Sequence, residues 1–550
     1  MITDELAALV HAALETAVSE GVIAAPELPS PNFERPRQEA HGDWSTNVAL
    51  AIKGSGSPRD TANAIKERIP ASDLVERVEV AGPGFLNFYL SQGWLHDVVR
   101  RALDPTTPFG HTNEGEGKKV NVEYVSSNPT GPINVVSGRH AAVGDAVANL
   151  LAATGYEVTR EFYINDAGRQ MSLFALSLRA RYLQQLGRDA KVPEDGYQGD
   201  YLVEFAARLA GEVGDKYVDL PDDEVERTFL AWGLPRMLES MKESLERFGT
   251  TYDVWFSELK LRDAGKLDEA VAALGAKDLT YQKDGAVWFR SSDFGDDKDR
   301  VLVRSNGEPT YLAGDIPYLI DKFERGFDRL IYVWGADHHG SVARLRGAGQ
   351  ALGFDPDRVE MLLLQIVTLV RGGDAVKASK RAGVLVPLDE LVDEVGKDAA
   401  RYTFLTRSFE APLEFDIELA KEQAPENPVY YVQYAHARIC SIVRKAASEG
   451  IEVRDGAALE LLTDPSEGAL MRKLASYEEV IPDAARLRAP QRVTRYLGEL
   501  ASAFSAFYRD AKVVSEDADL TNARLTLCLA VRSVLADGLT LLGVDAPERM

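Results

Sequence analysis

The stretch VNVEYVSSNPTGPINVVSGRHAAVGDAVANLLAATGYEVTREFYIN, from Val120 to Asn165, has the pattern of a strand, a turn, a helix and a second strand. Apolar and polar residues alternate over 120–124, as in a half-buried strand, and turn-forming residues fill 126–132. Apolar residues then recur at helical spacing until Gly155, and strand-like residues follow. This unit predicts two parallel strands joined through a helix.

The turn before the helix allows two interpretations. A helix N-terminus attracts anions because its first N–H groups are unpaired and its dipole is positive there, so a phosphate site near Gly131 to Gly138 is one of them. The other is a plain connection, because the turn holds neither a lysine nor a glycine-rich loop. This stretch alone does not separate the two.

Composition narrows the class of protein. The chain has 550 residues, of which 45% are hydrophobic and 27% are charged, as in ordinary globular proteins. Its formal net charge of −24 argues against indiscriminate nucleic-acid binding, but it leaves room for a structured RNA met by a local basic face. No apolar run approaches the roughly 20 residues that span a bilayer, and Cys440 and Cys528 suit core packing rather than disulfides. We predict a cytoplasmic protein with no membrane contact.

Patterns along the chain predict three parts. Residues 1–105 combine helix and strand patterns, and a charged, glycine-bearing linker follows them. Residues 115–413 alternate strands with helices, apart from a mostly helical insertion at about 170–262, which favours an α/β fold with a mainly parallel sheet. The expected strands are VNVEYV, VTREFYIN, RVLVRS, RLIYVWG and MLLLQIVTLV. Residues 414–550 have helical periodicity throughout.

A second stretch, VKASKRAG, runs from Val376 to Gly383 and follows an apolar strand and the turn RGGD. Its lysines and arginine, with Arg371 just before it, crowd a glycine-bearing loop that cannot be core. One interpretation is a solvated basic turn. The other is a set of cations that clamp a polyphosphate, in partnership with the turn before the first helix.

Several motifs lie along the chain in one order: EYVSSNPTGP, GRHAAVGDA, FYINDAGRQM, FGDDKDRVLVRSNGEPTYLAGDIPY, ASKRAG, NPVYYVQYAHARI and LLGVDAPERM. Together they resemble the motifs of the arginyl-tRNA synthetases, which are class I aminoacyl-tRNA synthetases, and they span nearly the whole chain. The resemblance implies an α+β N-terminal domain that contacts tRNA, a Rossmann-type catalytic domain with a parallel sheet, and an all-helical bundle that binds the anticodon. It also implies ATP as a substrate, Mg2+ with it, and arginine tRNA as the partner.

Matching positions acquire roles from this resemblance. The arginine contacts that it implies are Glu123, Asn128, Tyr311, Asp315 and His338. The ATP contacts are Asn134, Ser137, Gly138, Lys377 and Lys380, and the catalytic residues are Lys377, Ser379 and Lys380. A guanidinium presents five donors in a planar fork, so a carboxylate such as Asp315 suits it, although without the motif Asp315 would be interpreted as a surface or capping residue. The adjacent His338 and His339 have no third ligand nearby, so no metal site is predicted.

The first ATP motif departs from the family's pattern. Family members usually carry His-x-Gly-His after the Pro-Thr-Gly-Pro turn, whereas this chain has Asn134, Val135, Val136 and Ser137. Asn134 and Ser137 can donate hydrogen bonds but carry no charge, and each lost donor typically costs about 10²–10³ in rate. Val136 adds a side chain where a phosphate needs close approach. His140, one turn later, is either a solvent-exposed helix residue or an imidazole for the same phosphate.

Three functions stay open on the sequence. The first is an arginine–tRNA ligase with a divergent ATP motif, acting on L-arginine and arginine tRNA. The second is a catalytically impaired paralogue that serves as an RNA-binding or regulatory protein, because the missing histidines put activity in question. The third is an arginine-activating enzyme with a non-tRNA acceptor, which would not need the C-terminal bundle. We favour the first, and we expect a monomer, as is usual in the family.

Overall fold

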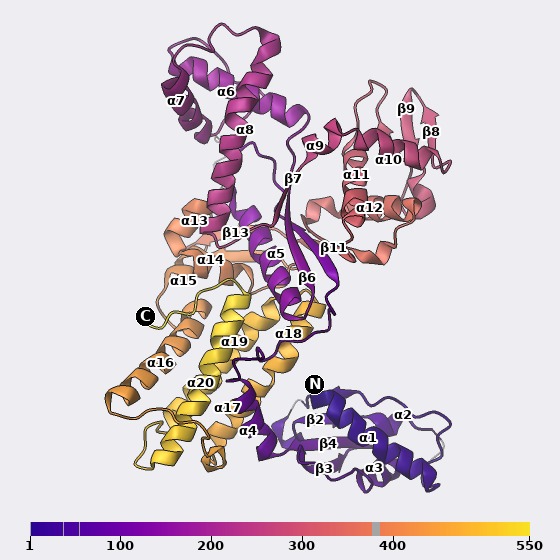
Figure 1. Ribbon diagram of the computed structural model, residues 1–550, viewed down its shortest axis with the longest axis vertical. Helices are drawn as coiled ribbons and strands as arrows, with labels where there is room; N and C mark the ends of the chain where they lie inside the picture. The colour runs from indigo at the N-terminus through magenta and orange to yellow at the C-terminus, as the bar shows by residue number, and fades with distance from the viewer. Residues whose placement is uncertain (1, 37, 54–55, 377–385) are drawn as a thin grey trace.

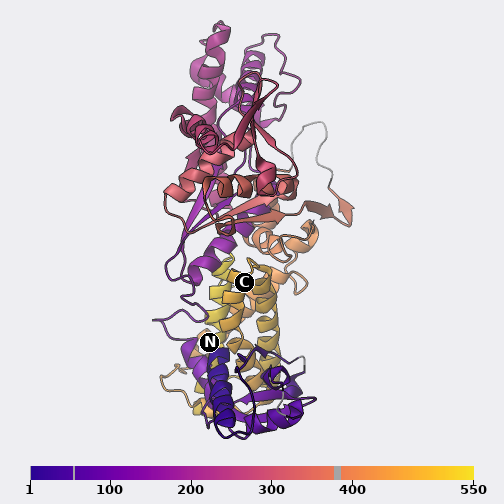
Figure 2. The same ribbon diagram turned by 90° about the vertical axis from the view of Figure 1, so that its right-hand side faces the viewer.

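The computed structural model describes residues 2–36, 38–53, 56–376 and 386–550. The molecule is elongated (Figures 1 and 2). A domain with a central sheet lies above a bundle of long helices, and a small α+β unit lies beside the lower end of the bundle. This arrangement confirms the expected fold class, an α/β region with an N-terminal α+β part and a helical C-terminal part.

The N-terminal unit packs its helices against a four-stranded antiparallel sheet of order β1-β2-β4-β3. The helix α1 turns Val10 and Leu14 inward, four residues apart on one face. The unit is joined to the bundle by α4, which packs on α17, and by an ion pair of 2.7 Å between Arg35 and Glu479. Its elements are α1 (Ile2–Ser19), β1 (Phe33–Glu34), η1 (Glu39–His41), β2 (Trp44–Thr46), α2 (Val48–Ala51), α3 (Pro58–Lys66), β3 (Val75–Ala81), β4 (Phe85–Leu90) and α4 (Gln92–Arg101).

A five-stranded parallel sheet of order β12-β11-β5-β6-β7 forms the centre of the molecule. Its elements, with the helix that joins the first two strands, are β5 (Lys119–Tyr124), α5 (Val135–Ala153), β6 (Glu157–Ile164), β7 (Val254–Ser257), β11 (Arg329–Gly335) and β12 (Val359–Leu364). The strand order changes direction at β5. In such folds ligands bind in the crevice at the carboxyl ends of the strands where the order reverses, which here is between β5 and β11.

Two insertions project from this sheet (Figure 1). The first contains α6 (Arg169–Gln185), α7 (Tyr201–Val213) and α8 (Asp222–Arg247). The residues Val254–Ser257, which the helical pattern included in this insertion, pair with β6 as the fifth strand. The second contains α9 (Glu258–Asp263), α10 (Lys266–Gly275), β8 (Thr280–Lys283), β9 (Ala286–Phe289), η2 (Ser291–Phe294), β10 (Arg300–Val303) and α11 (Tyr311–Glu324).

The strand expected in RVLVRS is β10, but it does not join the parallel sheet. It pairs antiparallel with β9 in a separate sheet of order β10-β9-β8, because the connection from Phe289 to Arg300 is too short for a crossover helix. The apolar run MLLLQIVTLV, expected as one strand, forms two: it supplies the end of β12 and most of β13 (Val367–Arg371). Strand β13 pairs with β14 (Asp374–Ala375) and β15 (Leu413–Asp416) in another sheet. Between β11 and β12 lie η3 (Ala336–His338), α12 (His339–Leu352) and η4 (Pro356–Arg358).

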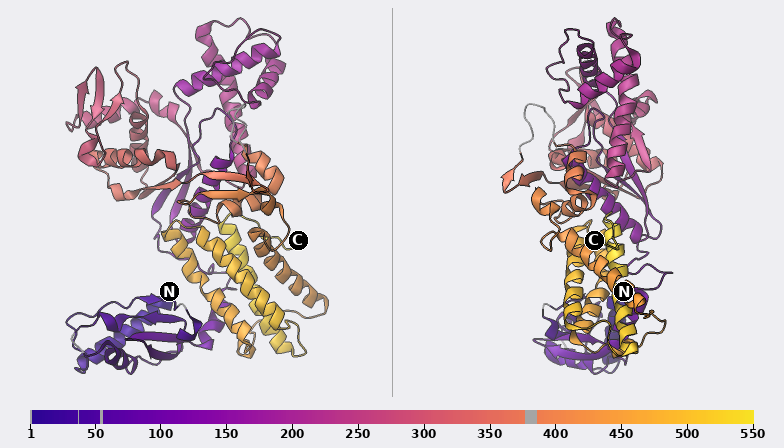
Figure 3. Two further views of the ribbon diagram at one scale, coloured as in Figure 1. Left: turned by 180° about the vertical axis from the view of Figure 1, so that it is seen from behind. Right: turned by 90° about the vertical axis from the view of Figure 1, so that its left-hand side faces the viewer.

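The C-terminal helices lie side by side below the sheet, as the view from behind shows (Figure 3). Cys440 and Cys528 are buried among them, as predicted. None of the helices in the described parts of the chain has both the length and the apolarity that crossing a membrane requires. The elements after β14, besides β15, are α13 (Leu388–Val395), α14 (Lys397–Phe404), α15 (Ile417–Lys421), α16 (Pro428–Ser448), η5 (Leu459–Leu461), α17 (Pro465–Ala475), α18 (Tyr477–Arg486), α19 (Gln491–Asp510) and α20 (Ala518–Leu541).

Candidate active site

The crevice at the end of β5 is bordered by a strained turn. Val125 and Ser126 both adopt left-handed backbone angles, with φ of 69° and 43°. A β-branched residue such as Val125 rarely does so, and surrounding contacts must hold it there. The Ser126 hydroxyl donates to Glu123 Oε1 at 2.9 Å and accepts from the N–H of Tyr163 at 3.1 Å. The turn therefore fixes the Glu123 carboxylate at the carboxyl end of the sheet.

A buried ion pair lies behind this crevice. Lys322 Nζ, from α11, is 2.6 Å from Glu123 Oε2, and both side chains are buried. The rings of Tyr318 and Tyr332 lie 4.3 and 4.0 Å from the ammonium. Lys322 was not among the residues expected from the sequence. Its position seven residues after Asp315, on the same face of a helix, was the signal that could have identified it.

Asp315 faces Glu123 from α11 and has no cation of its own among the described residues. Burial, followed by the negative charges of Glu123 and Glu258, raises the pKa of the Asp315 carboxyl to about 7, against the opposing effect of Lys322. A carboxyl group in this state favours a cationic ligand, because an opposite charge restores the ionised form. The structure thus brings two of the expected arginine contacts, Glu123 and Asp315, into one electrostatic group.

The other expected arginine contacts, Asn128, Tyr311 and His338, have exposed side chains. Tyr311, at the start of α11, is 75% exposed and lies one turn before Asp315. Asn128 is exposed in the turn after β5. The His338 ring, just after β11, contacts that of Trp334 at a tilt of 46°, with centroids 5.6 Å apart. No hydrogen bond, ion pair or ring contact joins these three side chains to Asp315 within the described residues, so the structure does not bring them into the group that Glu123 and Asp315 form.

The N-terminus of α5 carries the expected nucleotide residues. Asn134 is the N-cap of this helix, and its Oδ1 accepts from the N–H of Ser137 at 3.0 Å. No bond to the Asn134 Nδ2 group occurs within the described ranges, which leaves it as a donor. Ser137 Oγ lies 3.2 Å from Ser127 Oγ. Gly138 packs under Leu388, where an added Cβ would come within 2.6 Å of a leucine methyl group. Gly138 therefore permits helix packing at this point.

Lys377, Ser379 and Lys380 lie outside the described residues. The chain that follows them is anchored at the first ATP motif, because the N–H of Val135 donates to the Val386 carbonyl at 3.0 Å. The N-terminus of α5 is therefore bonded to the chain three residues after the second predicted phosphate stretch.

His140 also faces the crevice. Its ring lies near Gly335 at the end of β11, where Cε1 is 3.9 Å from the position that a Cβ on this glycine would take, and it is close to Asp337 and His338. Burial, with a smaller effect of Arg139, lowers the pKa of His140 to about 4. The imidazole is therefore neutral at pH 7, and the interpretation of His140 as a solvent-exposed helix residue is wrong.

Arg139, a buried arginine that the sequence did not indicate, links α5 to the chain around β13 and β15. Arg139 donates to the carbonyls of Gln365, Ile366, Ser408 and Ala411, at 2.7 to 3.5 Å. It thereby ties α5 to the start of β13 and to the loop before β15. These contacts join segments more than 200 residues apart, so no local sequence pattern could have indicated them.

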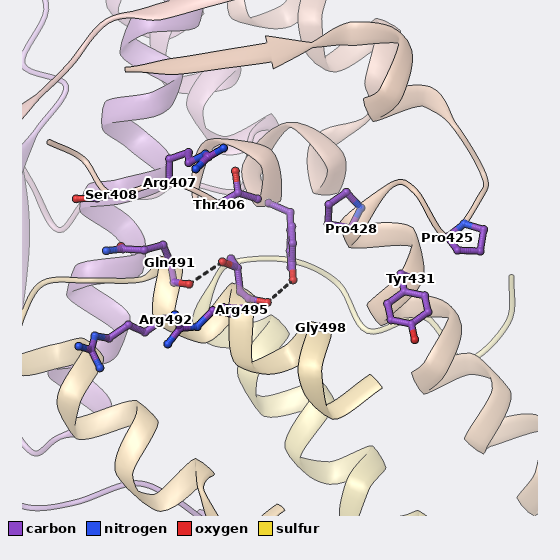
Figure 4. Close-up of a pocket in the computed structure, with 12 residues that line it drawn as sticks. Thr406, Arg407, Ser408, Pro425, Pro428, Tyr431, Gln491, Arg492, Arg495 and Gly498 are labelled. Carbon is purple, nitrogen blue, oxygen red and sulfur yellow. Dashed lines mark hydrogen bonds between the residues drawn. The ribbon is translucent and has the colours of Figure 1, made fainter. Parts of the chain in front are cut away.

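A cavity of about 670 Å3 lies away from this crevice, between the end of α14 and the helices α16 and α19 (Figure 4). Arg407, Arg492 and Arg495 contribute to its lining, with Tyr431 on the opposite side. Its cationic lining would suit a phosphate backbone. No group of His, Cys, Asp and Glu side chains suited to a metal ion occurs in the parts of the chain that the structure describes.

Comparison with known families gives three matches along the chain. An arginyl tRNA synthetase N terminal domain matches residues 4–90, the class I tRNA synthetase (R) catalytic domain matches 101–405, and a DALR anticodon binding domain matches 432–550. The order of these matches follows the N-terminal unit, the central sheet and the helical bundle.

Individual relatives agree with these matches. An arginine–tRNA ligase of Moorella thermoacetica is 50% identical over 99% of this chain and 98% of its own. One of Caldanaerobacter subterraneus subsp. tengcongensis is 47% identical over 100% of this chain and 98% of its own. The solved arginyl-tRNA synthetase of Thermus thermophilus superposes with a TM-score of 0.78 and 25% identity, and the match covers 100% of both chains. The chain belongs to the arginyl-tRNA synthetase family.

Proposed function

We propose that this protein is an arginine–tRNA ligase that activates L-arginine with ATP and transfers the arginyl group to arginine tRNA. The observation that carries the proposal is the Asp315 carboxyl group beside Glu123, which has no cationic partner among the described residues, near the point where the order of the parallel strands reverses. Full-length relatives with this named activity support it. Neither a role limited to regulation nor a non-tRNA acceptor has a specific observation in its favour.

In the first step the arginine guanidinium would pair with Asp315. Glu123, held by Lys322 and Ser126, would keep the negative potential on that side of the crevice. Asn128, Tyr311 and His338 would contact the polar groups of the amino acid. A planar fork of donors matched by fixed carboxylates would favour arginine over lysine.

ATP would bind beside it, at the N-terminus of α5. Asn134 Nδ2 and the Ser137 hydroxyl would supply neutral donors beside the positive end of the helix dipole. The Gly138 N–H already donates to the Asn134 carbonyl at 2.9 Å, so Gly138 would contribute close approach rather than a free donor. Mg2+ would arrive with the ATP phosphates as part of the substrate, since this ion is usually held by phosphates and few protein groups. Lys377, Ser379 and Lys380 would act on the phosphates as pyrophosphate leaves, with the lysines balancing the charge that develops.

In the second step a ribose hydroxyl at the end of the tRNA would attack the carbonyl carbon of the adenylate and release AMP. We propose that residues 1–105 contact the tRNA body, that 115–413 perform the chemistry with an insertion at about 170–262, and that 414–550 bind the anticodon. The match of residues 432–550 to an anticodon binding domain supports the last assignment. We further propose that the protein acts as a monomer in the cytoplasm.

Arginine-dependent exchange of pyrophosphate into ATP, measured with and without arginine tRNA, tests this function. Exchange that requires the tRNA, followed by formation of arginyl-tRNA, is the expected result. Binding of tRNA without exchange would instead indicate an impaired paralogue. Exchange without tRNA, and no arginyl-tRNA product, would indicate a different acceptor.

A further inference from the structure

The first insertion contacts the turn that precedes α5. Tyr201, the first residue of α7, donates a hydrogen bond from its phenol to the backbone carbonyl of Thr130 at 2.5 Å. The side chain of Thr130 is hydrogen-bonded to a second tyrosine of the insertion, Tyr197. None of the site residues expected from the sequence lies in this insertion. Part of the insertion is therefore bonded directly to the turn of the first ATP motif.

Gly131, the next residue of the turn, permits this close contact. A Cβ at this position would lie 3.3 Å from the hydroxyl oxygen of Tyr201 and 3.4 Å from the ring carbon that carries it. Gly131 is not among the glycines with a positive φ, so the backbone angle alone would accept another residue. The glycine is needed because the phenol packs against the turn.

The phenol belongs to a well-packed part of the insertion. Leu202 and Leu209, seven residues apart on one face of α7, are both buried. The loop before α7 is bonded to α6, because the N–H of Tyr197 donates to the Ser177 hydroxyl at 2.9 Å. Burial raises the pKa of Tyr201, so its hydroxyl keeps its proton and remains a donor to the turn.

The same turn is bonded at its other end to the chain that leads into α13. The N–H of Leu388 donates to the Ile133 carbonyl at 2.8 Å, one residue before Asn134. The backbone from Thr130 to Ile133 is thus fixed at both ends, and Asn134, the proposed phosphate donor, follows directly. Loss of the bond from Tyr201 would release one of these ends.

We propose that Tyr201 is a positioning residue for adenylate formation, whose phenol sets the path of the turn that brings Asn134 and Ser137 to the ATP phosphates. This inference rests on the proposed function, because it requires that ATP binds at the N-terminus of α5. Tyr201 acts through the Thr130 carbonyl and touches neither ATP nor arginine. A displacement of about 1 Å at reacting groups can cost about 10²-fold in rate, so a hydroxyl outside the crevice can still control the reaction.

Pyrophosphate exchange by full-length Tyr201→Phe, in the presence of arginine tRNA, tests this role. The change removes only the hydroxyl. We expect kcat/KM for ATP to fall about tenfold or more while the arginine KM stays within about twofold, because only the nucleotide half is displaced. An effect of stability alone would not separate the two substrates in this way.

Tyr182→Phe is the matched control. The Tyr182 hydroxyl donates to the Gly214 carbonyl at 2.7 Å within the same insertion, and it also accepts from the N–H of Tyr217. Its removal should therefore lower the melting temperature at least as much as Tyr201→Phe does. The kinetic parameters for ATP should stay those of the unaltered protein, because Tyr182 does not contact the turn.

Gly131→Ala provides a second variant that leaves the insertion intact. The added methyl group would press on the Tyr201 hydroxyl, so this change should also lower kcat/KM for ATP. It should cost little more in the Tyr201→Phe background, where that oxygen is absent. Additive losses in the double variant would show that the two residues act separately and would contradict the proposal.

The outcomes separate this inference from the proposed function. If the unaltered protein exchanges pyrophosphate and Tyr201→Phe has the same ATP parameters, this inference is wrong while the function stands. The same holds if Tyr182→Phe loses as much of kcat/KM for ATP as Tyr201→Phe does. If the unaltered protein gives no exchange with arginine tRNA, both are wrong. Should the melting curve of Tyr201→Phe show that it does not fold, unchanged ATP parameters in Gly131→Ala would overturn the inference.

Discussion

The two halves of the proposed active crevice would hold their substrates by different physical means. The amino-acid half is built from charged groups, in which Glu123 and Lys322 form a buried ion pair and Asp315 lies beside them. The nucleotide half, at the N-terminus of α5, offers only neutral donors from Asn134 and Ser137 among its described side chains. The amino-acid half would select arginine by its charge, so substitutions there should have large effects on arginine binding or on stability. The second depends on helix geometry, where single changes should have smaller ones.

Asp315→Ala should have the largest effect. A guanidinium that has left water would lose its charged acceptor, a loss of about 3–5 kcal/mol, which corresponds to an increase of about two to four orders of magnitude in the arginine KM. The KM for ATP should change little, because Asp315 lies in the other half. Pyrophosphate exchange at varied arginine concentrations measures both. An arginine KM within a factor of two of the original would show that the substrate binds elsewhere.

Lys322→Met should destabilise the protein itself. Its loss leaves the Glu123 carboxylate buried without a cationic partner, at a cost of about 3–5 kcal/mol. We expect a clear decrease in the midpoint of denaturant unfolding, and we expect the double change with Glu123→Gln to recover most of it, because the unpaired charge is then absent. Equal midpoints for the single variant and the unaltered protein would show that water or another group compensates for the lysine.

The sequence indicated the two carboxylates of the amino-acid half but not what surrounds them. Asp315 and Glu123 could be selected because they occur inside recognisable motifs. The pairing of Glu123 with Lys322 could not, since the two residues are 199 positions apart and only the fold brings them together. Glu258 was likewise inconspicuous, because a glutamate at the start of a helix usually serves the helix dipole.

In the nucleotide half the sequence predicted the strand, turn and helix around Asn134. It did not predict the hydrogen bonds that the side chains make there. The pattern predicted a strand, a turn and a helix around Asn134, and the structure has β5, the turn and α5 there. It could not show that the Asn134 oxygen caps the helix, which depends on the backbone angles of that one residue. The fifth strand, β7, was missed because four residues give too short a pattern to distinguish from a helix end.

Lys380→Ala should slow adenylate formation by about 10²–10³, the usual cost of losing one charged donor to a developing negative charge. The affinity for tRNA should stay nearly constant, because the charge acts on the transition state and not on the RNA. Single-turnover activation and tRNA binding by filter retention provide the two measurements. Parallel losses in both would identify the residue as an RNA contact instead.

The triple change Asn134→His, Val136→Gly and Ser137→His should have the smallest effect, and it is the only one that should increase activity. It supplies the two imidazoles and the clearance that the family's usual motif has. Activation should become roughly tenfold faster or more, because each donor can control up to about 3–4 kcal/mol. The same change lowers the stability of the helix, which offsets part of this gain. Loss of the Asn134 cap costs about 1 kcal/mol, and a glycine in the first turn costs a similar amount.

The control for this variant must separate chemistry from folding. Ser127→Ala removes the hydroxyl 3.2 Å from Ser137 without changing α5, and it should leave the rate within a few-fold of the original. The melting curve and tRNA affinity of the triple variant show whether the weakened cap has disturbed the helix. If the variant folds and binds tRNA but activates arginine no faster, the N-terminus of α5 is not a weakened phosphate site. Its neutral donors would then be sufficient, and the selectivity and rate of the enzyme would depend on the charged half of the crevice.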